Sequence, residues 1–372
     1  MIPNYLRPHP SGKHATVLHA LRGMIVAGRL SPGSRLPTRR QLESKFEAGP
    51  VTIQRALNYL AAEGFTEARG RLGTFVTANP PHLCHYGLAF FSHLGQVDQR
   101  RLDTAIMNEA SAINETHDRQ MRVYHDIVDQ PDLGAEHYRL IADAQANKLA
   151  GIIFTAKPPQ PLVKALATAA PQTPCVAIMS QPDVPNVTAV SLGEPFVAKA
   201  LQYLAARGRR RIACLSICSQ LPTILNWQKL LLTLIPQHGM TTEPYWMLTM
   251  GSRESATGVS AVVHLLFEPG RSNRPDALFI ADDNFVEHAT AGLLAAGVRV
   301  PEDVDVVAHC NFPWPVPNAM PVKRLGYDAR DVLRQCISVI DMQRRGQTPP
   351  KQVFVEAVFE EEVAAASEQH VA

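Results

Sequence analysis

The sequence of 372 residues has no uninterrupted apolar stretch of about 18 residues or more, the length that a membrane-spanning helix needs. Residues 1–8 likewise lack the apolar region of a signal peptide. Cysteine is scarce, and the six cysteines are scattered without C-x-x-C spacing, which favours structural thiols over a disulfide framework or a zinc knuckle. We therefore expect a cytoplasmic protein without membrane contact.

Catalytic and metal-binding motifs are also missing. No G-x-S-x-G, H-E-x-x-H, P-loop or G-x-G-x-x-G sequence occurs, so catalysis is not indicated. The segment His-Leu-Cys-His at residues 82–85 could be imagined as a metal clip, but it follows two prolines and lacks a second ligand cluster. We interpret residues 78–85 as a linker, and we expect neither a metal nor a cofactor.

Acidic residues are few at the amino end of the chain. Residues 1–79 contain eleven Lys and Arg, four Glu and no Asp, a net charge of +7, whereas the rest of the chain carries −5. A basic module on an acidic body indicates a polyanion partner for the module alone. A basic surface that is merely solvated is the alternative that charge leaves open.

The basic segment has the pattern of a small helical domain. Apolar residues at three- and four-residue spacing predict helices near residues 12–27 and 50–64. A shorter helix between them begins with Thr38 and Gln41, which have the spacing of a capping box. A hairpin with a basic turn follows at residues 65–77. Three helices and a basic-tipped hairpin, in this order, are typical of a winged helix-turn-helix.

The third predicted helix carries the residues suited to reading DNA. Ile53, Leu57 and Leu60 form its expected buried stripe, and Thr52 and Gln54 flank that stripe near the N-terminal end. A recognition helix presents this end to base edges and phosphates. Gln54 has the geometry to pair with the two major-groove atoms of adenine.

Three segments, GRLSPGSRLPTRRQLESKF, VTIQRALNYLAAEGF and GTFV, follow one another as in GntR-type regulators, and residues 12–77 resemble that family. The resemblance implies that Arg40 and the early recognition-helix residues Thr52, Gln54 and Arg55 contact DNA. Arg40 and Arg55 would hold phosphates or guanine. For Arg55 a structural salt bridge, for instance to a group on the first helix, is the alternative.

Two positions depart from the resembled family, which often has arginine where Pro50 stands and glycine where Arg71 stands. Base preference and the contact of the hairpin with DNA could therefore differ. Arg71 could enter a minor groove, since arginine suits narrow grooves of negative potential, or it could be a solvated turn residue.

After residue 85, apolar strand-like runs alternate with helical stretches. This alternation predicts a parallel sheet with helices on both faces, and the number of strands favours two similar lobes. Strands are predicted at residues 86–91, 121–127, 151–155, 175–179, 211–216, 277–281 and 304–308, and helices at 102–115, 195–207 and 286–296.

The phrases LAGIIFTA, AKALQYLAARGRRRIACLS, PDALFIADDNFVEHATAGLLAAGVRVPEDVDVVAH and QTPPKQVFVEAVFEEEV resemble the sensor domain of LacI/GalR-type repressors. That domain shares the fold of periplasmic sugar-binding proteins, and the resemblance covers nearly all of residues 86–365. It implies that a small molecule binds between two lobes, and that lobe closure changes the grip of a homodimer on DNA. A dimer is expected to read an operator of palindromic half-sites.

The candidate ligand residues match this second family only in part. Asp282-Asp283 stand where the family has Asn-Asp, so Asp283 is a candidate acceptor for a ligand hydroxyl or amine, with a helix N-cap as its alternative role. Cys310-Asn311 replace a frequent Asp-Asp, and Asn311 is a second candidate. Arg253 could pair with an acidic ligand or be a solvated loop residue. The missing groups argue against assuming an ordinary sugar, and the pocket could be vestigial.

The sequence thus predicts an α+β winged helix-turn-helix domain at residues 1–77, the linker at 78–85, and an α/β two-lobed periplasmic-binding-protein-like (type I) domain at 86–365. The expected function is sequence-specific transcriptional regulation, with repression implied by resemblance and an unidentified small-molecule effector. An enzyme with an aminotransferase-like body is a competing interpretation, but no lysine lies in a Schiff-base motif. A solute-binding protein for transport is another, and it would need an export signal.

Overall fold

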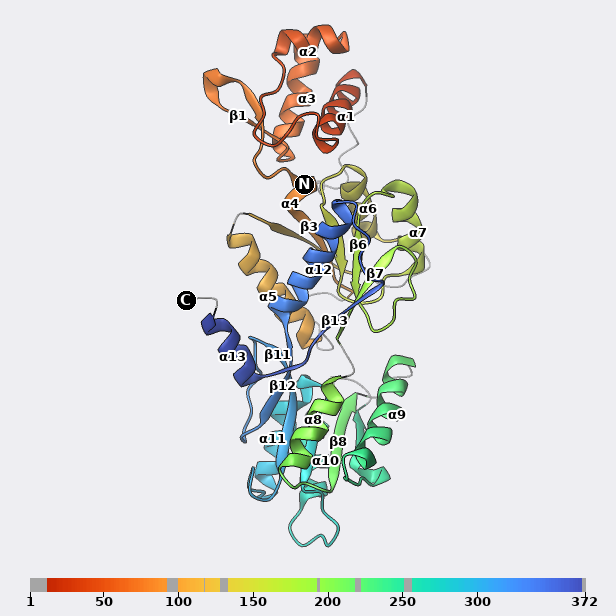
Figure 1. Ribbon diagram of the computed structural model, residues 1–372, viewed down its shortest axis with the longest axis vertical. Coiled ribbons are helices and arrows are strands. Elements are labelled where there is room, and N and C mark those ends of the chain that lie inside the picture. Colours follow the sequence, from red (N-terminus) through yellow and green to blue (C-terminus); the bar gives the residue numbers. More distant parts are fainter. Residues whose placement is uncertain are drawn as a thin grey trace. The chain divides into compact units, whose positions relative to one another are not determined.

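The computed structural model describes residues 12–91, 100–116, 118–127, 133–192, 195–217, 222–250 and 256–369. These residues form a small helical domain with a two-stranded hairpin, followed by two six-stranded sheets with helices (Figure 1). Among the described helices, none is long and apolar enough to cross a membrane.

The amino-terminal elements are those of a winged helix. They are α1 (Lys13–Val26), α2 (Arg39–Phe46), α3 (Pro50–Ala62), β1 (Thr66–Ala68) and β2 (Thr74–Val76). The two strands pair in antiparallel fashion, and Gly70–Leu72 form a 3-10 turn between them. The capping box is confirmed, because the Thr38 side chain accepts from the Gln41 backbone and the Gln41 side chain accepts from the Thr38 backbone. The element order predicted from the sequence is therefore confirmed.

One apolar core holds these helices together. Leu21 on α1, Ile53 and Leu60 on α3, and Phe65 before β1 are fully buried. Burying each such side chain contributes about 1.5–3 kcal/mol, so this core accounts for much of the stability of the domain. Leu57, which the sequence places in the buried stripe, is only half-buried.

The predicted linker is partly ordered secondary structure. Its residues Pro81–Cys84 form the short helix α4, with proline at the first helical position where no N–H is needed. His85 already belongs to strand β3 (His85–Ala89). The chain packs as two compact units: Met1–Phe91 with Ala110–Val176 and Val339–Pro349, and Ser92–Glu109 with Ala177–Ser338 and Pro350–Ala372. The domain boundaries expected at 77 and 85 divide the chain differently and stay predictions.

The first six-stranded sheet has the strand order β13-β7-β6-β5-β3-β4. Strand β3 pairs in parallel with β4 and β5, and β13 pairs in parallel with β7, although most of the second sheet separates these two in sequence. Its other strands are β4 (Gln120–Tyr124), β5 (Gly151–Phe154), β6 (Cys175–Ile178), β7 (Val187–Leu192) and β13 (Gln352–Val355), and its helices include α5 (Arg101–Glu115), α6 (Ala135–Gln145) and α7 (Gln160–Ala169).

The second sheet has the order β14-β12-β11-β10-β8-β9, with β14 antiparallel to β12 and the other pairs parallel. Its strands are β8 (Ile212–Ile217), β9 (Met247–Met250), β10 (Ala277–Ile280), β11 (Asp305–Phe312), β12 (Lys323–Asp328) and β14 (Val358–Phe359). The remaining helices are α8 (Pro195–Ala206), α9 (Pro222–Gln237), α10 (Ala256–Phe267), α11 (Val286–Ala295), α12 (Ala329–Arg344) and α13 (Glu360–Gln369). The sequence predicted β8, β10 and the first half of β11 but missed β7, β9, β12, β13 and β14.

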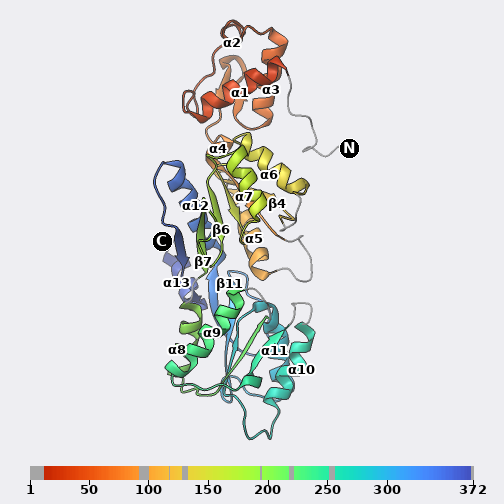
Figure 2. The same ribbon diagram turned by 90° about the vertical axis from the view of Figure 1, so that its right-hand side faces the viewer.

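Helices α10 and α11 lie side by side in both views (Figures 1 and 2). Val263 on α10 and Leu293 on α11 share an apolar core with Leu278 of β10. Because the strands run in parallel, the carboxyl ends of β10 and β11 lie at the same edge of the sheet, where ligands of open α/β sheets bind.

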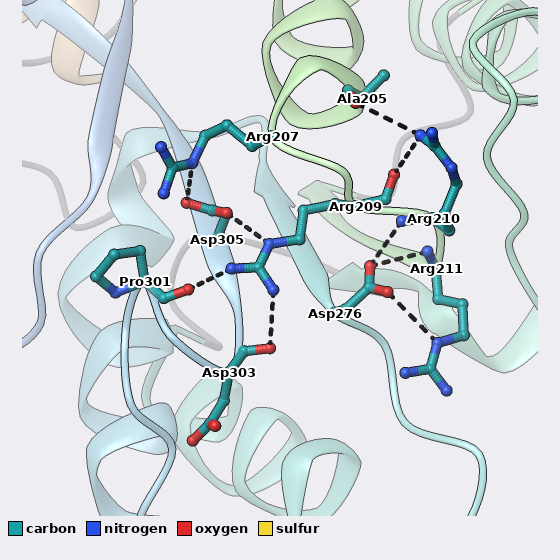
Figure 3. Close-up of polar contacts among 9 residues, drawn as sticks. All are labelled: Ala205, Arg207, Arg209, Arg210, Arg211, Asp276, Pro301, Asp303 and Asp305. Atoms are coloured by element: carbon teal, nitrogen blue, oxygen red, sulfur yellow. Dashed lines mark hydrogen bonds and ion pairs between the residues drawn. The ribbon is translucent and has the colours of Figure 1, made fainter.

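At the opposite edge of this sheet, where the parallel strands begin, arginines within residues 207–211 form ion pairs and hydrogen bonds with two aspartates. Asp305, buried at the start of β11, accepts from Nε of Arg207 at 2.7 Å and Nε of Arg209 at 2.5 Å (Figure 3). Asp276 accepts from the backbone N–H groups of Arg210 and Arg211 at 3.0 and 2.9 Å. These arginines therefore join the beginnings of β8, β10 and β11, a structural role.

Candidate functional site

Four of the residues expected to contact DNA lie on the surface of α2 and α3. Arg40 on α2 and Arg55 on α3 are exposed, and Thr52 and Gln54 are half-exposed on the first turns of α3. Helix α3 begins at Pro50, and its buried residues are Ile53, Ala56 and Leu60. The structure thus brings together the residues that the sequence nominated on these helices, and their contact with DNA stays a prediction.

Gln54 is held by two neighbours. Its Oε1 accepts a hydrogen bond from the guanidinium of Arg39, the first residue of α2, and its Nε2 donates to Oδ1 of Asn58 at 2.7 Å. Sequence analysis missed Arg39. The available signal was its place beside Arg40 at the start of the short helix, but nothing in the sequence alone shows that it reaches α3.

The three candidate DNA-binding arginines carry charges that no described carboxylate neutralises. Arg40, Arg55 and Arg71 are exposed, and within the described part of the chain none of them forms an ion pair. The salt bridge considered for Arg55 is absent among these residues, and it is Arg22 of α1 that pairs with Glu63. Unpaired exposed cations are suited to phosphate contact. Arg71 lies in the exposed turn of the hairpin.

Two residues expected to bind a ligand meet in the second sheet. Asn311, near the end of β11, donates from Nδ2 to Oδ2 of Asp283 at 2.8 Å, and both are buried, with 2% and 4% of their surfaces exposed. The N-cap role considered for Asp283 belongs to its neighbour: Asp282 accepts from the backbone N–H of Asn284 at 3.0 Å. The Asp283 carboxylate is therefore left to face Asn311.

His309 completes this cluster, and sequence analysis missed it. Its Nδ1 lies 3.9 Å from Oδ1 of Asp283. Nδ1 of His309 and Oδ1 of Asn311 are both buried without a hydrogen-bond partner among the described residues. Because a buried polar atom without a partner costs about 1–3 kcal/mol, such atoms mark a place where a ligand or water is expected. The available signal was strand periodicity, since residues two apart on β11 project from the same face.

Aromatic rings border the cluster. Phe196 on α8 contacts His309 edge to face, with ring centroids 5.3 Å apart, and Tyr327 on β12 lies 6.0 Å from both rings. Burial raises the pKa of the Tyr327 phenol, so it stays neutral. Cys310 is buried, and burial together with the charge of Asp283 raises the pKa of its thiol to about 12, so it supplies no charge. Few polar groups among apolar and aromatic ones is the usual composition of small-molecule sites.

Two candidates remain: Arg253 as a ligand residue and residues 82–85 as a metal clip. Arg253 lies outside the described residues. The segment at residues 82–85 belongs to α4 and β3, and within the described ranges no three His, Cys, Asp or Glu side chains are grouped so that they could hold a metal ion.

Two parts of the chain each match a known family model. Residues 13–76 match the family described as bacterial regulatory proteins, gntR family, and residues 201–358 match the periplasmic binding protein-like domain. The second half thus matches a periplasmic-binding-protein-like domain and not an aminotransferase-like body.

Characterised relatives match one half or the other. The HTH-type transcriptional regulator TauR of Rhodobacter capsulatus is 38% identical over 74 residues, 19% of this chain and 15% of TauR. The HTH-type transcriptional repressor PurR of Aliivibrio fischeri is 28% identical over 153 residues, 39% of this chain and 45% of PurR. The chain therefore spans less than half the length of these curated relatives.

Solved structures match the second half more fully. A LacI family transcriptional regulator from Lactobacillus casei with bound glucose is 18% identical, with a TM-score of 0.56, over 74% of this chain and 98% of its own. At this identity the match establishes the fold, two parallel-sheet lobes. Residues 13–76 thus match the family model of the bacterial regulatory proteins, gntR family, and residues 201–358 match the periplasmic-binding-protein-like domain, whose fold the LacI regulators share.

Proposed function

We propose that the chain is a sequence-specific DNA-binding transcriptional regulator whose affinity for its operator is modulated by a small molecule. One observation carries the DNA-binding half: a GntR-family winged helix presents Arg40, Thr52, Gln54 and Arg55 at its surface, in a segment of net charge +7. Exposed cations on one compact module suit the phosphate backbone, and the N-terminal end of α3 suits the major groove. Arg71 would add a contact from the hairpin.

The sensing half rests on the Asp283, Asn311 and His309 cluster. The buried atoms Oδ1 of Asn311 and Nδ1 of His309 have no described partner, so they could form hydrogen bonds with a ligand. Within the described residues, no Lys or Arg pairs with Asp283. A buried carboxylate without a neighbouring cation disfavours an acidic ligand, because like charges repel in a poorly solvated site. We therefore propose a neutral or cationic effector rich in hydroxyl or amine donors, a sugar or related metabolite. Proteins of this fold are seen with glucose and with cellobiose.

We also propose a homodimer and a repressing role. Two winged helices on a homodimer would read two palindromic half-sites, the commonest arrangement of such domains. PurR is a repressor, so repression is the proposed direction. A regulator acts where its DNA lies, so we propose a cytoplasmic location.

The test is selection of DNA by the purified full chain, followed by binding at several salt concentrations and with a panel of sugars, amines and organic acids. The proposal expects a palindromic site, affinity that falls steeply with salt, and a shift of affinity with one neutral or cationic compound. Absence of any selected sequence would refute the DNA-binding half. Specific binding that no compound shifts would point to a vestigial sensor, and a shift caused by an organic acid would contradict the proposed effector class.

A further inference from the structure

Building on the proposed function, we propose that Arg39 is a specificity-determining residue of the DNA-binding surface. It positions the Gln54 amide so that Gln54 reads one base pair. Arg39 lies on α2 and Gln54 on α3, so the contact joins the two helices of the helix-turn-helix at the surface proposed to face DNA.

The two hydrogen bonds fix which way the amide faces. Arg39 donates to Oε1, and Nε2 donates to Asn58 Oδ1, one turn further along α3. Guanidinium is only a donor, so it selects the oxygen end of the amide. The bond is charge-assisted, and no described carboxylate competes for Arg39. The flipped amide would face its NH₂ toward the cation and lose that bond.

The orientation of the Gln54 amide leaves hydrogen-bonding groups that can pair with a base. An amide oxygen accepts two hydrogen bonds and an NH₂ group donates two, and Gln54 uses one of each within the protein. One acceptor and one donor remain, in a fixed order. Adenine presents the complementary donor and acceptor, N6–H and N7, in the major groove. A glutamine fixed in advance also avoids the entropy cost of ordering a long side chain on binding.

A simple phosphate contact by Arg39 predicts something different. Phosphate contacts carry no sequence information, so their loss weakens every duplex by the same factor and lowers the salt dependence. A positioning residue changes discrimination at the one base step that its partner reads. The two roles are therefore separated by measuring the pattern across sequences.

The experiment uses the full chain, its selected operator, and a set of duplexes with each half-site base pair replaced in turn. The Gln54→Ala variant identifies the base step that Gln54 reads. We expect Arg39→Ala to reduce discrimination at that same step roughly tenfold, equivalent to ~1.4 kcal/mol. In the double variant, Arg39→Ala should cause no further loss at that step, since its effect passes through Gln54.

Arg40→Ala is the matched control, because Arg40 is the adjacent exposed arginine and has no described partner on α3. It should leave discrimination at the Gln54 step unchanged, whether Arg40 holds a phosphate or a guanine elsewhere in the site. Asn58→Ala tests the network from its other end and should also lower discrimination at the Gln54 step, which covers the case in which Arg39→Ala does not fold.

The proposal is overturned if Arg39→Ala weakens all duplexes equally, or if discrimination at the Gln54 step survives. A further loss at that step in the double variant would also overturn it, because Arg39 would then act independently. If the unmodified chain selects no DNA sequence, the proposed function itself fails, and that result is seen before any variant is made.

Discussion

Asn311 Nδ2 donates to Asp283 Oδ2 across 2.8 Å, which ties the end of β11 to the residue that follows β10 by three positions. Both side chains are buried. The bond uses one oxygen of the carboxylate and the amide NH₂, so the amide oxygen of Asn311 and the second carboxylate oxygen are left as acceptors. In the proposed function, these two oxygens would accept hydrogen bonds from the effector.

Replacing Asp283 should remove the response to the effector. In Asp283→Ala, the ligand loses its main acceptor and Asn311 loses its partner, so we expect effector affinity to fall about five- to 150-fold, from the loss of ~1–3 kcal/mol. The dose of effector that shifts operator binding reports this change. Asp282→Ala is the matched control: it removes the cap of the following turn, and we expect a normal effector dose with a stability loss of about 1 kcal/mol. An unchanged dose in Asp283→Ala would contradict the assignment.

Gly326 on β12 admits no side chain. A Cβ there would lie 1.8 Å from the backbone oxygen of Cys310, its partner on β11, and backbone cannot move aside as a side chain does. Gly326→Ala should lower the free energy of unfolding by about 3 kcal/mol or more. Gly23→Ala, on the exposed face of α1 with no atom within 4 Å, should instead raise it by about 0.5–1 kcal/mol. Urea unfolding of both variants checks the signs, and a stable Gly326→Ala would show that the β11–β12 register is wrong.

The buried carboxylate of Asp305 should matter more than either arginine that it pairs with. Asp305→Ala leaves Arg209 without its carboxylate partner and with only the backbone carbonyls of Pro301 and Asp303, so we expect a loss of about 3 kcal/mol in the free energy of unfolding (Figure 3). Arg207→Ala should cost less than about 1 kcal/mol, since 42% of the Arg207 side chain is exposed and Arg209 still serves Asp305. Equal losses in the two urea titrations would refute this account.

Local rules made the winged helix predictable. The Thr38 capping box and the spacing of Ile53 and Leu60 depend on residues within one or two helical turns, which the sequence displays directly. The contact of Arg39 with Gln54 depends instead on how α2 packs against α3, and no local pattern encodes it.

The second half shows the same limit. Strand β12 contains Lys323, Arg324 and Gly326, so it lacks the apolar run by which buried strands were recognised. Asp283 and Asn311 were nominated one by one from resemblance, but their hydrogen bond follows from the register of β10 against β11, which only the folded sheet fixes. His309 was missed because the predicted strand ended at residue 308, so the periodicity that puts His309 on the same face as Asn311 was not applied to it.

Two buried histidines lead us to expect that the first compact unit is sensitive to acid. Burial and, to a lesser extent, the charge of Arg344 lower the pKa of His82 to about 4, and burial and Arg122 lower the pKa of His85 to about 4. Each ring has a buried Nδ1 without a partner among the described residues, and the His82 ring stacks on Phe65 with centroids 5.9 Å apart. Both rings are therefore neutral in the folded chain at pH 7.

Acidification should consequently destabilise this unit between about pH 6.5 and pH 4. The unfolded chain protonates these histidines near pH 6.5, whereas the folded chain resists until about pH 4, so the free energy of unfolding falls as the pH falls through that window. For each ring the slope is at most about 1.4 kcal/mol per pH unit, and solvent screening reduces it. His82→Gln or His85→Gln should shrink the drop in urea midpoint between pH 7 and pH 5, while His288→Gln, on α11 of the other unit, should not. If an NMR titration of the folded chain gave pKa values near 6.5 for His82 and His85, this explanation would be contradicted.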